Sequence, residues 1–153
     1  MLGTGGAIKN AIPVLEKQFF VLNGDSVFLI DLDAMIKFHE DNRADLTLAL
    51  AKVKDKSRFG NVQIDEKFRI MEFFEKNNIG GDLISGGIYL FERDNFDWNV
   101  FPKKFSIEKD FFPHAVIQKN IFGFFSDSYF IDIGTAEDYE KFGKHLRSGS
   151  VLL

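Results

Sequence analysis

Residues 19–22 are apolar at every position and end abruptly in the polar turn Asn23-Gly24-Asp25. An apolar residue at every position, rather than at alternate ones, is typical of a strand buried on both faces of a parallel sheet. In such sheets, ligands bind beyond the carboxyl ends of the strands. Gly24 would allow a sharp turn and the close approach of a ligand. The segment therefore predicts an α/β fold with a ligand site near Asp25.

The same turn allows a second interpretation, because Asn-Gly is a strong signal for a β-hairpin. Residues 26–31 do not alternate like a returning strand, however, and Asp33 can cap a helix that ends near Asn42. Helices are also expected at residues 7–12, from Ser106 to about 119 with a break at Pro113, and after Thr135. Further strands are expected at residues 45–53, 61–65, 69–75, 83–91, 121–125 and 129–133. We interpret the chain as one domain, residues 1–153.

The composition excludes several classes of function. The 153 residues are 45% apolar and include 19 Phe, which favours a packed core over disorder. The absence of Cys excludes disulfides and Cys-based zinc or redox sites. The net charge of −4 without a Lys/Arg cluster gives no footprint for nucleic acid, and no apolar run suits a signal peptide or membrane span. We expect a cytoplasmic protein that binds neither nucleic acid nor membranes.

The glycine-rich segment Leu2-Gly3-Thr4-Gly5-Gly6 is expected to form a loop before the first helix. Free backbone N–H groups and the positive end of a helix dipole would suit an anion or a nucleotide there. The spacing matches neither the dinucleotide fingerprint nor the P-loop. Taken alone, the segment is better interpreted as a plain loop that leads into a helix.

Asp132 interrupts the otherwise apolar run from Tyr129 to Ile133. A buried carboxylate is costly unless it is paired or bound to a metal, so we expect Asp25 and Asp132 to come together. Two carboxylates that hold one Mg²⁺, with its other positions left to phosphate oxygens and water, suit that ion. The alternative is that the backbone N–H groups of Gly134 and Thr135 satisfy Asp132 at the start of a helix. Spacing alone leaves both open.

Two further segments could carry chemistry. Lys76, which follows Glu75 at the end of an expected strand, could reach a phosphate, although such a Lys is more often a solvated charge. The paired glycines in Ser85-Gly86-Gly87 suggest a bulge or the close approach of a ligand. No His lies at nucleophile-base spacing from a Ser and an acid, so a Ser-His-Asp hydrolase is not expected.

These motifs together resemble the sugar-1-phosphate nucleotidyltransferases. The resemblance is greatest to the branch that includes D-glycero-D-manno-heptose 1-phosphate guanylyltransferase and the mannose-1-phosphate guanylyltransferases, and it covers essentially the whole chain. The motifs that carry it occur in the order of the family: Leu2-Gly3-Thr4-Gly5-Gly6-Ala7-Ile8, Phe20-Val21-Leu22-Asn23-Gly24-Asp25, Arg58-Phe59-Gly60-Asn61-Val62, Phe74-Glu75-Lys76, Ser85-Gly86-Gly87-Ile88-Tyr89 and Phe130-Ile131-Asp132-Ile133-Gly134-Thr135.

The resemblance implies a Rossmann-like three-layer α/β fold and nucleotidyl transfer from an NTP, here GTP, to a sugar 1-phosphate of the heptose or mannose type. The products would be an NDP-sugar for surface polysaccharide or glycan precursors and pyrophosphate. It also implies a role for each matching residue: nucleotide binding by Leu2, Gly3, Thr4, Gly5, Gly6, Asn23 and Gly24; sugar-phosphate binding by Gly60, Glu75, Ser85, Gly86 and Gly87; catalysis by Asp25, Lys76 and Asp132; and Mg²⁺ binding by Asp25 and Asp132.

The Gly-Gly-x-Gly-Thr-Arg-Leu signature of the family should precede this sequence and is not found in it. We therefore expect the chain to lack the N-terminal strand and the triphosphate-binding loop, and not to catalyse the transfer alone. The strand at 19–22 would lose a neighbour, which favours a homo-oligomer or strand exchange. The alternative function is a truncated or non-catalytic relative that binds sugar phosphate or a partner subunit without turnover. In-frame sequence upstream of Met1 would discriminate between the two.

Overall fold

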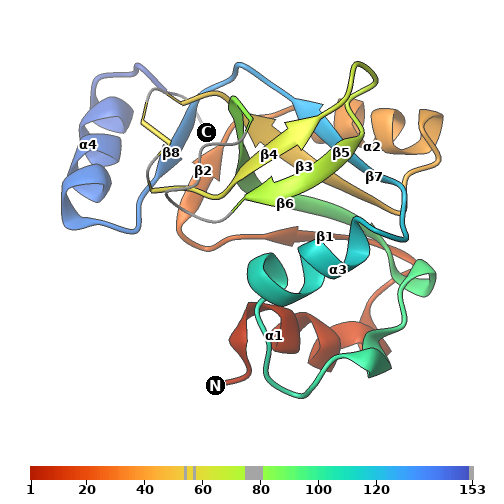
Figure 1. The fold of residues 1–153 in the computed structure, drawn as a ribbon. Helices are drawn as coiled ribbons and strands as arrows, with labels where there is room; N and C mark the ends of the chain where they lie inside the picture. The colour runs from red at the N-terminus through yellow and green to blue at the C-terminus, as the bar shows by residue number, and fades with distance from the viewer. Residues whose placement is uncertain (54, 57, 75–80, 152–153) are drawn as a thin grey trace.

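The structure, a computed structural model, describes residues 1–53, 55–56, 58–74 and 81–151 (Figure 1). Its helices are α1 (Gly3–Ala11), α2 (Leu32–Asp41), α3 (Phe112–Ala115) and α4 (Ala136–Arg147), with short helical turns at Ile12–Val14, Arg93–Asn95, Trp98–Val100 and Ile107–Phe111. Its strands are β1 (Gln18–Leu22), β2 (Ser26–Phe28), β3 (Leu46–Ala51), β4 (Asn61–Ile64), β5 (Ile70–Phe74), β6 (Leu83–Glu92), β7 (Ile121–Phe125) and β8 (Phe130–Asp132).

The central sheet is mixed rather than parallel. Its strand order is β5-β4-β6-β3-β7, and β1 also pairs with β6. Among the described strand pairs, only β3 and β7 run parallel. Strand β3 occupies one edge of the long strand β6, whereas β4 and β1 pair with opposite ends of its other edge. The predicted α/β class is confirmed, but the parallel direction predicted for the strand at 19–22 is wrong.

Strand β1 is less buried than its sequence predicts. Phe19 is buried and its ring stacks on that of Phe91, with centroids 5.3 Å apart, but Leu22 is 59% exposed. The run is apolar at each position because Phe19 packs into one core while Phe20 lies against the other. The hairpin alternative is also not observed, because β2 pairs with β8 and not with β1. Strand β2 itself was not predicted.

Two hydrophobic cores lie against the central sheet and make the molecule layered. One is rich in aromatic side chains, including Trp98, Phe111 and Phe112, and is covered by α1, α3 and the turn before α3. The other contains Phe28 and Met35 and is covered by α2. Figure 1 shows α1 and α3 grouped below β1, while α2 lies beside β3 and β7. In the part of the chain that the structure describes, no helix is both long and apolar enough to cross a membrane.

The helix boundaries differ from the prediction where several caps were possible. Helix α2 is capped by Asp31, which accepts a hydrogen bond from the Ala34 N–H at 2.9 Å, and not by Asp33. The predicted cap of α4 is confirmed, because the Thr135 hydroxyl accepts from the Asp138 N–H at 3.1 Å. The helix predicted after Ser106 is shorter than expected and consists of a π-helical turn followed by α3.

Candidate active site

Asp25 and Asp132 lie next to each other because β2 pairs with β8. In this antiparallel pair, Ser26 lies opposite Asp132. The pairing extends one step further, since the Ile133 N–H donates to the Asp25 carbonyl at 2.7 Å. One carboxylate therefore precedes β2 and the other ends β8, and the two backbones are held in register.

The two carboxylates face a common space beside Gly134. A methyl group placed on Gly134 would lie 3.1 Å from Asp132 Oδ1 and 3.8 Å from Asp25 Oδ2. The Gly134 N–H also donates to Asp132 Oδ1 at 2.9 Å, as the alternative interpretation of Asp132 expected. That bond engages only one lone pair of one oxygen, so the carboxylate keeps acceptor capacity for a cation.

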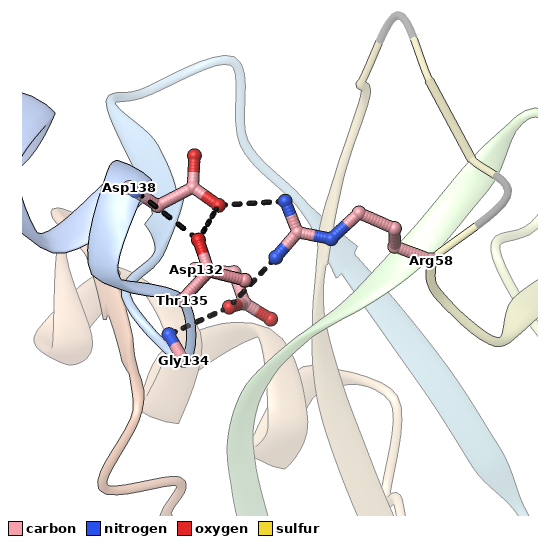
Figure 2. Close-up of polar contacts among 5 residues, drawn as sticks. All are labelled: Arg58, Asp132, Gly134, Thr135 and Asp138. Carbon is pink, nitrogen blue, oxygen red and sulfur yellow. Dashed lines mark hydrogen bonds and ion pairs between the residues drawn. The ribbon is translucent and has the colours of Figure 1, made fainter.

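Arg58 approaches Asp132 from the loop that precedes β4 (Figure 2). Its guanidinium donates to Asp138 Oδ2 at 2.6 Å and to Asp132 Oδ1 at 3.4 Å. Asp138 also accepts from the Thr135 hydroxyl at 2.8 Å. Hydrogen bonds lower the pKa of Asp138 below its usual value. The Arg58 guanidinium has the larger effect and the Thr135 hydroxyl the smaller. From the sequence, Arg58 belonged to a motif but had no assigned role, because nothing local to it indicates a partner on α4.

The predicted nucleotide residue Asn23 lies against the predicted sugar-phosphate segment of β6. Its N–H donates to the Gly87 carbonyl at 2.8 Å, and a methyl group on Gly87 would come within 3.0 Å of the Asn23 side chain. The Ser85 hydroxyl donates to the Tyr89 hydroxyl at 3.2 Å, and the Asn23 side chain lies close enough to that hydroxyl to affect its pKa. Tyr89 therefore links the two segments, a role that the sequence did not reveal.

Of the glycines predicted to bind a ligand, Gly86 has a structural reason to be glycine, whereas Gly24 does not. Gly86 has no room for a side chain, because a methyl group there would lie 2.3 Å from the ring of Phe28. Gly24, by contrast, has no positive φ, and a methyl group there would meet nothing within 4 Å. The turn before Asp25 therefore does not require glycine, and its backbone faces open space. Gly60 directly precedes Asn61, whose partner in β6 is Ile84, so it lies near Ser85.

The glycine-rich segment is not the free loop that we predicted. Gly3 to Gly6 form the first turn of α1, and the N–H groups of Gly5 and Gly6 donate to the Phe105 carbonyl at 3.1 and 3.3 Å. These two donors are therefore engaged within the protein. Figure 1 places α1 beneath β1 and apart from β2, β8 and α4, so the segment 2–6 does not join the carboxylate pair.

The donor chemistry of the carboxylate pair fits Mg²⁺, although the pair is small. Carboxylate oxygens are the ligands that this ion prefers, and it commonly takes one or two of them while phosphate and water fill its other positions. Among the described residues, no group of three or more His, Cys, Asp or Glu could hold a metal. Glu75 and Lys76, predicted to bind the sugar phosphate, lie outside the described residues.

Comparison with known proteins identifies relatives along nearly the whole chain. It is 43% identical to D-glycero-alpha-D-manno-heptose 1-phosphate guanylyltransferase of Aneurinibacillus thermoaerophilus, over 95% of this chain and 64% of that protein. It is 39% identical to mannose-1-phosphate guanylyltransferase of Mycobacterium tuberculosis, over 90% of this chain and 40% of that protein. The chain therefore spans less than two thirds of the length of either relative.

A solved structure confirms the predicted fold. The chain superposes on the crystal structure of HddC from Yersinia pseudotuberculosis complexed with GMP-PN with a TM-score of 0.80 and 36% sequence identity, over 95% of this chain and 63% of that one. The family model described as nucleotidyl transferase matches residues 1–149. The chain therefore belongs to the nucleotidyl transferase family.

Proposed function

We propose that this chain forms part of a guanylyltransferase that joins GTP to a heptose or mannose 1-phosphate, giving a GDP-sugar and pyrophosphate for surface polysaccharide or glycan synthesis. The names of its relatives and the nucleotide bound by HddC support this choice. The observation that carries it is the convergence of Asp25 and Asp132 on one space, beside the segments that hold Asn23 and Ser85.

In the proposed reaction, a phosphate oxygen of the sugar 1-phosphate attacks the α-phosphorus of GTP. The new phosphorus–oxygen bond forms as the bond to the bridging oxygen breaks, and pyrophosphate leaves. The attacking phosphate is already anionic near neutral pH, so the step requires positioning and charge neutralisation rather than a general base. This requirement agrees with a site that contains carboxylates and no Ser-His pair.

Each predicted site residue would have a role in this reaction that depends on its position. Asp25 and Asp132 would hold Mg²⁺, which when bound would neutralise charge on the phosphate oxygens. Asn23 and Gly24 would lie beside the nucleotide, while Gly60 and Ser85-Gly86-Gly87 would line the sugar-phosphate pocket. The segment Leu2-Gly3-Thr4-Gly5-Gly6 would contact the nucleotide base with groups other than the engaged N–H donors of Gly5 and Gly6. Glu75 and Lys76 keep the sugar and phosphate roles that the sequence predicts.

The first test measures metal binding by the 153-residue chain. Electron paramagnetic resonance would detect bound Mn²⁺, with Mg²⁺ as the competitor. We expect Asp25→Asn and Asp132→Asn each to weaken Mn²⁺ binding by about tenfold or more, because each removes a negative ligand. Their free energies of unfolding should change by less than about 1 kcal/mol, since neither side chain is buried. Asp127→Asn, in the exposed loop between β7 and β8, is the matched control. Equal binding by all variants would contradict the proposal.

A second measurement separates catalysis from binding without turnover. Calorimetric titration with mannose or heptose 1-phosphate in the presence of Mg²⁺ should detect binding that Asp132→Asn weakens. Pyrophosphate release with GTP then shows whether the chain turns over alone. Binding without release would support the non-catalytic alternative for this chain, whereas release by the wild-type chain would support the full reaction.

A further inference from the structure

Arg58 contacts Asp132, one of the two carboxylates that we propose as metal ligands. Its Nη2 lies 3.4 Å from Asp132 Oδ1, while Nη1 lies 2.6 Å from Asp138 Oδ2 (Figure 2). The side chain is 43% exposed, so it is not locked in place by packing. Arg58 is therefore a partly exposed side chain that stands between a candidate metal ligand and helix α4.

The two contacts of Arg58 are unequal. The distance to Asp138 is typical of a charge-assisted hydrogen bond, and the distance to Asp132 is longer than such bonds usually are. Asp138 is itself held at the start of α4 by the Thr135 hydroxyl, which donates to the same oxygen at 2.8 Å. Asp138 thus anchors the guanidinium. The weaker contact, with Asp132, is the one that would break more easily.

A divalent cation bound to either oxygen of Asp132 would lie within a few ångströms of the Arg58 guanidinium, and the two positive charges would repel each other. Asp132 Oδ1 already accepts the Gly134 N–H at 2.9 Å and is also contacted by Arg58. When the metal is absent, however, two adjacent carboxylates repel each other, and a nearby cation offsets that repulsion.

We propose that Arg58 is a positioning residue that holds Asp132 in place of a divalent cation and is displaced from it when the cation binds, remaining anchored on Asp138. This inference rests on the proposed metal role of Asp25 and Asp132. Arg58 competes with the metal, and Asp138 sets the strength of that competition by retaining the guanidinium on α4.

The test is a double-mutant cycle on Mn²⁺ affinity, measured by electron paramagnetic resonance on the full chain. Arg58→Gln removes the competitor and should tighten Mn²⁺ binding by about fivefold, the scale of an exposed ion pair. Asp138→Asn releases Arg58 from its anchor toward Asp132 and should weaken binding by about threefold. In the Arg58→Gln background, Asp138→Asn should have no further effect, because its influence passes through Arg58.

The non-additivity separates competition at Asp132 from long-range electrostatics. If charge alone mattered, the effects of the two substitutions would add. Lys56→Gln is the matched control, because it removes an equal charge from the same loop, where Lys56 pairs with Asp82 at 2.9 Å. It should change Mn²⁺ affinity far less than Arg58→Gln. Arg58→Lys, which keeps the charge but loses the two-pronged contact, should give an intermediate affinity.

The outcomes distinguish this inference from the proposed function. Mn²⁺ binding that depends on Asp25 and Asp132 but not on Arg58, or an additive cycle, would overturn the inference and leave the metal site standing. Binding that is independent of both carboxylates, or absent from wild type and Arg58→Gln alike, would overturn both. If Mn²⁺ binds to the Arg58→Gln variant but not to the wild-type chain, Arg58 excludes the metal completely, which would support the inference.

Discussion

Tyr89 illustrates how one buried side chain can organise a site that it does not enter. The residue is fully buried in β6, and its hydroxyl accepts a hydrogen bond from the Ser85 hydroxyl and lies close to the Asn23 side chain. A buried hydroxyl needs such partners, because leaving it unpaired would cost free energy. The ring also contacts Phe112 edge to face, with centroids 5.2 Å apart. Tyr89 thus connects the aromatic core to both predicted ligand-binding segments.

The ionisation of Tyr89 predicts a specific loss of stability at alkaline pH. Burial raises the pKa of Tyr89 to about 12, despite opposing hydrogen bonds from Ser85 and Asn23. Below pH 10 the hydroxyl is protonated in both the folded and unfolded chains, so stability is unaffected there. Between pH 10 and 12 the unfolded chain loses the proton first, which removes about 2 kcal/mol of the free energy of unfolding by pH 12.

Tyr89→Phe should remove this alkaline loss while costing about 1 kcal/mol near pH 7, because the hydroxyl hydrogen bonds disappear. Urea unfolding at a series of pH values from 7 to 11.5 would measure both effects. Tyr139→Phe is the control, since Tyr139 is 64% exposed. An identical alkaline loss in wild type and Tyr89→Phe would contradict the assignment.

At the scale of elements, the bulge in β6 determines how β1 and β2 meet the sheet. Leu48 of β3 lies opposite Tyr89, but Leu50 lies opposite Ser85, so β6 contributes extra residues between these pairs. Gly87 has a φ of +79° there, a conformation that favours glycine. The bulge directs the Gly87 carbonyl toward Asn23, as bulges near functional sites often redirect a strand. The sequence offered a bulge or a ligand approach at these glycines, and the bulge is observed.

The contact between Gly86 and β2 gives a prediction at this scale. Gly86→Ala should destabilise the protein by about 1–3 kcal/mol, because the added methyl group would overlap the Phe28 ring and approach the Ala49 carbonyl at 3.3 Å. Gly24→Ala should change stability by less than about 0.5 kcal/mol, since its methyl group would meet no atom within 4 Å. Thermal or urea unfolding of both variants provides the measurement.

A second-site change tests the cause of that loss. Phe28→Leu removes part of the ring that the Gly86→Ala methyl group would strike. The double variant should therefore lose less stability than the sum of the two single variants. Equal stability of Gly86→Ala and Gly24→Ala, or strict additivity with Phe28→Leu, would show that the close approach of Phe28 does not constrain β6.

At the scale of the whole molecule, β1 is an edge strand in the part of the chain that the structure describes. It pairs only with β6 among the described strands. The Asn23 N–H faces β6, as does the Lys17 carbonyl, so the backbone groups of Gln18, Phe20 and Leu22 face away. An edge of this kind, with an exposed apolar Leu22, can pair with another chain.

We therefore expect the chain to self-associate in a concentration-dependent way through β1. Leu22→Lys should lower the association constant by about tenfold, because charged edge residues oppose strand pairing. Val14→Lys is the matched control, since Val14 is 84% exposed but lies outside the sheet. Sedimentation equilibrium over a range of concentrations would measure all three proteins. A wild-type chain that stays monomeric throughout would refute the prediction.

Much of the secondary structure and half of the candidate site could be predicted from local sequence patterns. The strands β3 to β8 lie where strands were expected, and α4 begins at the Thr135 cap, because hydrophobic periodicity and capping are set by residues close together in the sequence. Asp25 and Asp132 could be paired because each carboxylate ends or follows an apolar segment. The family resemblance was confirmed by relatives along the chain.

Only the tertiary structure decided the strand directions, the bulge and the partners of Arg58 and Tyr89. An apolar run indicates a strand, but it shows neither how deeply the strand is buried nor which strand pairs with it, because both depend on residues far apart in the sequence. For the same reason, the contact between Arg58 and Asp138 leaves no local pattern. The sequence indicated Asp25 and Asp132 as a candidate pair, whereas long-range packing decided that β2 and β8 bring Asp25 beside Asp132.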